Sequence, residues 1–184
     1  NRSLKPKTSF GETISSILFA IVAATIVHNY VIQPYIIPTG SLEKSLLIGD
    51  FLFVSKFHYG ARVPMTAISL PMVHDTIPLL KIRSYLKKPQ LPYLRLPGVK
   101  KIKRNEIVVF SWPADTVRQF FVKEKRVDKP IDKKSNYVKR CVGIPGDTLE
   151  ILNGFVYTNG SKNILPDRAK VQYTHHAYSQ KGVS

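Results

Sequence analysis

An uncharged apolar stretch near the N-terminus limits the possible folds more than any other feature of this sequence. Residues 13–32 contain no Asp, Glu, Lys or Arg, and a helix of that length spans about 30 Å, the thickness of the hydrocarbon core of a bilayer. Its most polar side chains, His28 and Asn29, lie near the C-terminal end, where the membrane interface can hydrate them. The stretch therefore predicts a transmembrane helix. The alternatives are a buried helix of a soluble protein and a cleaved signal peptide, although no small-residue cleavage site follows the run.

Basic residues before this stretch set the expected orientation of the helix. Arg2, Lys5 and Lys7 precede it, and the positive-inside rule places such a flank in the cytoplasm. We therefore expect three parts: a cytoplasmic segment at residues 1–12, a single transmembrane helix at residues 13–32, and a domain at residues 33–184 on the other side of the membrane.

The chain as a whole is strongly basic. It has 28 Lys+Arg against 12 Asp+Glu, a formal net charge of +16, which suits a polyanionic partner such as nucleic acid or an anionic lipid surface. No DNA-reading motif is evident, and basic residues gather among apolar ones at positions 81–104. Membrane lipids are therefore the expected partner, and nucleic acid is not. No group of Cys and His has zinc-ligand spacing, and the sequence indicates neither a metal nor an organic cofactor.

Short apolar runs separated by glycine and proline characterise the chain after the helix. Asn153-Gly154 is a strong hairpin signal between two such runs. The pattern predicts a mainly β fold, in which an all-β domain follows the N-terminal transmembrane helix. Strands are expected at residues 50–54, 107–110, 137–142, 148–152 and 155–157.

Two segments interrupt this pattern. Residues 61–105 are irregular and rich in proline, and we expect them to form an insertion at the surface. Residues 123–134 are highly charged, which predicts an exposed loop.

Ser41 and Lys139 have the clearest catalytic potential. Ser41 follows Gly40 just beyond the predicted helix, and a glycine there allows a sharp turn and the close approach of a substrate carbonyl. A serine hydroxyl needs an adjacent base before it can attack a carbonyl, and no histidine is an evident candidate. Lys139 lies in an apolar strand, where removal from water disfavours the charged ammonium and favours the neutral amine of a general base. The alternative is a lysine that extends from its strand to water.

Three segments of the chain resemble, in order, the motifs of the bacterial type I signal peptidases, the Ser/Lys-dyad peptidase family S26. The first resembles the nucleophile motif, the second the segment that follows it in the family, and the third the general-base motif. They are Ile37-Pro38-Thr39-Gly40-Ser41-Leu42-Glu43, Leu46-Leu47-Ile48-Gly49-Asp50-Phe51-Leu52-Phe53-Val54 and Tyr137-Val138-Lys139-Arg140-Cys141-Val142-Gly143-Ile144-Pro145-Gly146-Asp147.

The resemblance implies a role for each matching residue. Ser41 would be the nucleophile and Lys139 the general base. The backbone N–H of Ser41 and the hydroxyl of Thr39, which stands where the family has a serine, would be the two oxyanion donors. The residues that match the lining of a shallow cleft for small substrate side chains are Tyr35, Ile37, Leu46 and Val138.

The resemblance also implies a function and a location. It describes a membrane-bound serine endopeptidase that removes N-terminal signal peptides from exported preproteins by cleavage after small residues, of the Ala-X-Ala type. The all-β part would be a signal-peptidase-like catalytic domain with a proline-rich insertion at residues 61–105. The protein would sit in the bacterial inner (cytoplasmic) membrane as a single-pass protein, with its catalytic domain on the extracytoplasmic side.

The sequence also departs from the family pattern. Lys44-Ser45 replaces the usual Pro-Thr, and we find no counterpart before Ser184 of the family's C-terminal motif, which holds a serine that orients the lysine and an Asp/Arg pair. We therefore expect the sequence to be part of a longer protein. Two rival interpretations stay open: a non-catalytic relative that binds signal peptides or lipids, and a soluble Ser/Lys self-cleaving repressor, against which the predicted membrane helix counts.

Overall fold

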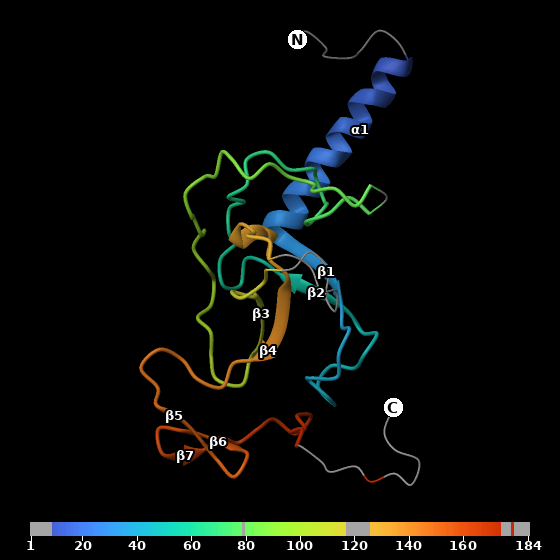
Figure 1. Cartoon of the computed structure of the whole chain (residues 1–184). Coiled ribbons are helices and arrows are strands. Elements are labelled where there is room, and N and C mark those ends of the chain that lie inside the picture. The colour runs from blue at the N-terminus through green and yellow to red at the C-terminus, as the bar shows by residue number, and fades with distance from the viewer. Residues whose placement is uncertain (1–8, 79, 117–125, 174–177, 179–184) are drawn as a thin grey trace. The chain divides into compact units, whose positions relative to one another are not determined.

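The N-terminal half of the chain begins with a helix that leads directly into a strand. The computed structural model describes residues 9–78, 80–116, 126–173 and 178. Helix α1 (Ser9–Ile26) continues as a π-helical turn (Val27–Val31) and is followed by β1 (Ile32–Ile36), as Figure 1 shows. The helix therefore ends one residue before the predicted end of the apolar stretch.

The apolar side chains of α1 are exposed. Phe10 and Phe19 are 75% and 76% exposed, and Ser9–Val31 is long and apolar enough to cross a membrane, with none of its apolar window buried against other parts of the chain. An exposed apolar surface of this size is unfavourable in water and favourable in lipid. These exposures support a membrane anchor and count against the buried helix of a soluble protein.

In the described part of the chain, three small antiparallel sheets follow the helix. Strands β1 and β2 (Phe51–Ser55) form the first, β3 (Ile107–Ser111) and β4 (Asn136–Arg140) form the second, and β5 (Leu149–Leu152), β6 (Phe155–Thr158) and β7 (Ser161–Lys162) form the third. All five predicted strands are confirmed to within two residues at each end. The mainly β class after one apolar helix is thus confirmed, whereas β1 and β7 were not predicted.

The third sheet contains the predicted hairpin. Leu149 pairs with Thr158 and Leu152 with Phe155, so that Asn153 and Gly154 form the two-residue turn. Both have a positive φ, of 49° and 80°. This is the conformation that a tight hairpin turn requires and that Asn-Gly adopts readily.

The chain divides into two compact units, which we describe separately. One contains residues 1–35, 53–101 and 109–137, and the other contains residues 36–52, 102–108 and 138–184. In the first unit, residues 62–95 fold back on themselves through four isolated antiparallel bridges, Arg62–Arg95, Thr66–Gln90, Ser69–Tyr85 and Thr76–Arg83. Most of the proline-rich segment is therefore an irregular hairpin and not a fully open loop.

The prediction of an exposed charged loop at residues 123–134 is wrong for Lys129 and Lys133, while residues 123–125 lie outside the described residues. Lys129 is buried, with its Nζ 3.0 Å from Asp75 and 3.4 Å from Asp115. Lys133 is also buried. These charges can be buried because each finds partners that lie far away in the sequence.

Asp132 attaches this charged segment to the irregular hairpin. Its Oδ2 accepts the N–H groups of Met65 (3.1 Å) and Thr66 (2.9 Å), and its Oδ1 accepts the Thr66 hydroxyl (3.0 Å). Three hydrogen bonds thus occupy both carboxylate oxygens.

We expect Asp132→Ala to lower the free energy of unfolding by about 2–3 kcal/mol, because it leaves two partly buried N–H groups and a hydroxyl without an acceptor. Asp132→Asn keeps one carbonyl oxygen for the two N–H groups and should cost less than half as much. Thermal unfolding of the detergent-solubilised protein, followed by the fluorescence of its one tryptophan, Trp112, would measure both. Equal stability of the alanine variant and the parent would contradict this role.

Candidate active site

Ser41 opens a tight turn in the second unit. The turn is closed by hydrogen bonds from the N–H of Glu43 to the Gly40 carbonyl (3.0 Å) and from the N–H groups of Ser45 and Leu46 to the Leu42 carbonyl (both 2.9 Å). Leu42 is buried, whereas Ser41 is exposed. The buried leucine fixes the turn in place, so that the neighbouring serine faces outward.

Lys139 reaches this serine from strand β4. Its Nζ lies 2.6 Å from the Ser41 Oγ, and the lysine side chain is half-buried. The two residues are 98 positions apart in the sequence, so the fold is what joins them. A base within about 2.6–3.2 Å of a hydroxyl is placed to take its proton. The structure therefore brings together the predicted nucleophile and its predicted base.

The turn is also supported from β4 by Arg140, the residue after the lysine. Its Nη2 donates to the Ser45 Oγ and its Nη1 donates to the Asn105 carbonyl, both at 2.7 Å. The Ser45 hydroxyl in turn donates to the Arg168 carbonyl at 2.7 Å. Lys139 and Arg140 thus contact the same turn at two points, which limits how far the serine and the lysine can move apart.

Residues near the C-terminus contact the turn as well. Gln172 donates from Nε2 to the Gly40 carbonyl (2.9 Å), and Lys170 lies 3.5 Å from the Glu43 carboxylate. The sequence analysis gave these two residues no role. No local pattern could have indicated these contacts, because Gln172 lies 132 positions from Gly40.

The sharp turn expected at Gly40 is not a left-handed one. The φ of Gly40 lies outside the left-handed region, and a Cβ built there would meet atoms no closer than 3.9 Å. A side chain would thus fit at this position by its backbone and its neighbours. The expected close approach of a substrate carbonyl to Gly40 stays a prediction.

The other predicted site residues divide between the two units. Ile37 is buried, and its backbone forms hydrogen bonds with Gly49 and Asp50. Thr39 is exposed, whereas Leu46 and Val138 are half-buried. These four belong to the unit that contains the serine and the lysine.

Tyr35 belongs to the other unit. Its hydroxyl accepts a hydrogen bond from the Asn136 Nδ2 at 2.8 Å, and burial raises the pKa of Tyr35 to about 12. Its ring also faces the ammonium of Lys56 at 6.0 Å. The structure thus gives Tyr35 partners of its own in that unit.

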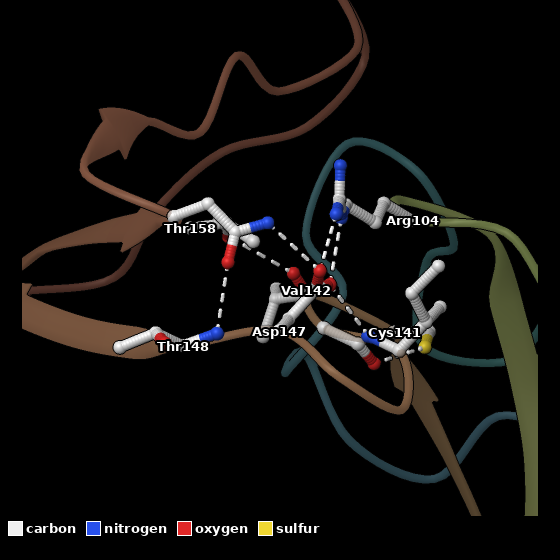
Figure 2. Close-up of polar contacts among 9 residues, drawn as sticks. Arg104, Cys141, Val142, Asp147, Thr148 and Thr158 are labelled. Carbon is white, nitrogen blue, oxygen red and sulfur yellow. Dashed lines mark hydrogen bonds and ion pairs between the residues drawn. The ribbon is translucent and has the colours of Figure 1, made fainter.

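A second turn, immediately after the lysine strand, is organised by Asp147. Figure 2 shows this carboxylate between Arg104 and the turn. It accepts from the Arg104 guanidinium, from the N–H of Ile144 (2.9 Å) and from the Asn159 side chain (3.0 Å). These bonds give the segment Gly143-Ile144-Pro145-Gly146-Asp147 a structural role, because they fix the conformation of the chain where it leaves β4.

The bonds to Asp147 make a pH-dependent contribution to stability. The Arg104 guanidinium, the largest cause, holds the pKa of Asp147 well below its ordinary value of 3.8. A depressed pKa stabilises the fold above the ordinary value, and the stabilisation is lost as the pH falls through the folded-state value. We expect the melting temperature of Asp147→Asn to lie below that of the parent at pH 7, with a difference that shrinks below pH 3.8. A difference that stayed constant across this range would contradict the assignment.

Comparison with known proteins identifies relatives along nearly the whole chain. The sequence profile of the family described as "Signal peptidase, peptidase S26" matches residues 10–182. "Signal peptidase I" of Rickettsia typhi is 27% identical over 158 residues, which are 86% of this chain and 47% of that protein. "Signal peptidase I" of Rickettsia massiliae is 28% identical over 147 residues, 80% of this chain and 42% of the relative.

A third relative is somewhat more similar over a shorter segment. "Signal peptidase I" of Buchnera aphidicola is 30% identical over 145 residues, which are 79% of this chain and 32% of that protein. The chain thus spans about half or less of the length of the curated relatives that it matches. No solved structure gave a significant match.

Proposed function

Because the chain belongs to the signal peptidase family, peptidase S26, we propose that it is a membrane-anchored serine endopeptidase that removes signal peptides from exported preproteins. The observation that carries this proposal is the 2.6 Å contact between the Lys139 Nζ and the Ser41 Oγ. Of the predicted candidates, this pair alone combines a nucleophile with a base in hydrogen-bonding reach.

The proposed reaction begins with Lys139 as a neutral amine. The amine takes the proton of the Ser41 hydroxyl while Oγ attacks the carbonyl carbon of the small P1 residue. The resulting ammonium gives this proton to the leaving amine as the peptide bond breaks, which leaves an ester between Ser41 and the signal peptide. Lys139 then takes a proton from water, whose oxygen attacks the ester, and the same proton returns to the Ser41 oxygen as the acid product leaves.

Two groups are proposed to stabilise the negative oxygen of the tetrahedral intermediate. One is the backbone N–H of Ser41, and the other is the hydroxyl of Thr39, which is exposed two residues before the nucleophile. Preorganised donors of this kind usually provide a large part of the rate acceleration of acyl transfer.

We assign the substrate preference to apolar residues around the dyad. Branched side chains on the floor of a shallow cleft would exclude large P1 and P3 side chains and admit alanine, which accounts for a preference of the Ala-X-Ala type. The proposed lining beside the dyad consists of Ile37, Leu46 and Val138. Tyr35, which matches a fourth lining residue of the family, belongs to the other unit, where its hydroxyl is bonded to Asn136, and its contact with substrate stays a prediction.

The anchor places this chemistry at a membrane. In our proposal residues 1–12 are cytoplasmic, residues 13–32 span the bacterial cytoplasmic membrane once, and residues 33–184 form a catalytic domain on the extracytoplasmic side, with residues 61–105 as a proline-rich insertion. The basic flank at Arg2, Lys5 and Lys7 supports this orientation. A site beside the membrane would meet signal peptides where they leave the bilayer.

The experiment that tests the proposal is cleavage of a synthetic signal peptide by the purified chain in detergent. The expected result is a single cut after the P1 alanine of an Ala-X-Ala site, and a matched peptide with leucine at P1 should be cut at least about tenfold more slowly, since steric exclusion acts on P1. Binding of the peptide without cleavage would contradict the enzyme and favour the non-catalytic relative.

Ser45 is a positioning residue in this proposal. Ser45→Ala removes the acceptor of the Arg140 Nη2 and the donor to the Arg168 carbonyl, so the turn that carries the nucleophile loses support from two sides. We expect kcat to fall about tenfold, equivalent to about 1.4 kcal/mol, with little change in KM, and Ser45→Thr to restore most of it. A change confined to the melting temperature, with kcat intact, would show that these bonds serve stability alone.

A further inference from the structure

The first unit, which does not contain Ser41 or Lys139, has a cavity whose lining includes Tyr35 but none of Ile37, Leu46 and Val138. Its volume is about 440 Å³, within the range of small-molecule sites, roughly 300–1,000 Å³. Thr25, His28 and Asn29, at the C-terminal end of the apolar helix, line one part of it. The cavity therefore lies where a membrane helix passes from hydrocarbon to water.

The charges around this cavity are mainly positive. Its lining includes Lys56, Arg62, Arg95 and Lys133, and its acidic member among the lining residues is Asp132. Both oxygens of Asp132 are already engaged by hydrogen bonds from Met65 and Thr66. Four cations thus face one carboxylate in this lining, an excess of positive charge that favours an anionic ligand.

Lys56 and Arg62 are the cations least satisfied by the protein. Within the described part of the chain, the Lys56 ammonium has no hydrogen bond or ion pair, and the Arg62 guanidinium donates to the Ser111 hydroxyl at 3.0 Å. Burial, followed by repulsion from Arg62, lowers the pKa of Lys56. An anion that bound both groups would relieve the repulsion and supply the missing acceptors.

The remaining cations already have partners. Arg95 donates to the Tyr93 hydroxyl (3.0 Å) and the Tyr59 carbonyl (3.2 Å), and Lys133 donates to the Ser69 hydroxyl (2.5 Å). The amide side chains of Asn29, Gln33 and Asn136 also line the cavity. Neutral donors beside a lysine and an arginine suit the oxygen atoms of a phosphate group.

We propose that this cavity binds the phosphate headgroup of an anionic phospholipid, with Lys56 and Arg62 as its principal contacts. A free phosphate would offer the same oxygens, but the helix end that lines the cavity favours the lipid. Polar and basic groups just beyond a membrane span lie at headgroup depth, where lipid phosphates are within reach. The site does not depend on the peptidase activity proposed above.

The test titrates the full chain, purified in a neutral detergent, with short-chain phosphatidylglycerol and phosphatidylcholine, and follows the fluorescence of Trp112 and the melting temperature. We expect saturable binding of phosphatidylglycerol at least tenfold tighter than that of phosphatidylcholine. Lys56→Gln/Arg62→Gln should weaken phosphatidylglycerol binding by at least tenfold. The control Lys100→Gln/Lys101→Gln removes the same charge from two exposed positions and should stay within twofold of the parent.

Further arms separate the possible sources of the phosphate. Equal affinity for glycerol phosphate and phosphatidylglycerol would indicate a site for soluble phosphate and overturn the lipid assignment. Equal affinity for the two lipids, or a double variant that binds like the parent, would overturn the site. Arg62→Gln also loses the hydrogen bond to Ser111, so Lys56→Gln is measured alone as well. We expect this single variant to unfold as cooperatively as the parent and to bind phosphatidylglycerol severalfold more weakly.

Discussion

Ser41→Ala and Lys139→Ala are each expected to lower kcat/KM for an Ala-X-Ala peptide by about 10⁴-fold or more, with KM nearly unchanged. Without Oγ no acyl-enzyme can form, and Lys139→Ala removes the amine that lies 2.6 Å from that oxygen and is proposed to take its proton. Catalytic groups that act as one unit are strongly non-additive, so the double variant should be about as slow as either single one. Steady-state kinetics on the three proteins measures all of these effects.

Matched controls separate chemistry from general damage. Ser161→Ala and Lys103→Ala remove the same two residue types at exposed positions of the unit that contains the dyad, and both should keep kcat within twofold. Losses that multiplied in the double variant would mean that serine and lysine act independently. A Lys139→Ala enzyme with more than a tenth of the parent's activity would rule out that lysine as the base.

Thr39→Val should lower kcat by about 10²–10³-fold, the usual effect of removing one oxyanion donor. Valine matches threonine in shape but lacks the hydroxyl, so packing around this exposed residue should hardly change. Thr39→Ser, which restores the family's usual residue, should stay within a few-fold of the parent. The expected pattern is a fall in kcat at constant KM, because the donor acts on the transition state and not on the ground-state substrate.

A different pattern would reassign the oxyanion site. If Thr39→Val raised KM and left kcat intact, the hydroxyl would bind substrate and the backbone N–H of Ser41 would be the single donor contributed by this turn. Equal losses in the serine and valine variants would point to a steric requirement for threonine.

The parts of the fold that could be predicted are those whose cause is local. An uncharged apolar run of about 20 residues is long enough to span a bilayer, and a helix satisfies its backbone hydrogen bonds internally there. The Asn153-Gly154 turn was equally accessible, since both residues adopt a positive φ and the turn alone sets the strand register.

The parts that could not be predicted depend on distant partners. In the sequence, Lys129 and Lys133 look like solvated charges. In the structure both are buried, because Lys129 forms ion pairs with Asp75 and Asp115 and Lys133 donates a hydrogen bond to Ser69. A local charge pattern gives no information on whether such partners exist. The same reason explains why residues 62–95 appeared irregular although they pair with themselves.

The candidate site shows the same division. Ser41 and Lys139 were accessible because they lie in segments that resemble the family's nucleophile and general-base motifs, whereas the local setting of Lys139 alone left open a side chain that extends to water. Their contact, and the support of the turn by Arg140 and Gln172, are products of the fold. The sequence therefore identified the candidate reacting groups and left out the groups that hold them in place.

The most direct test of the central claim is to trap the acyl-enzyme. A peptide ester with alanine at P1 is mixed with the parent chain, quenched in acid within the first turnover and mapped by mass spectrometry. A Ser41/Lys139 peptidase should carry the acyl group on Ser41, and Lys139→Ala should carry none at the same time point. An adduct on another residue, or ester turnover that persists in Ser41→Ala, would contradict the account.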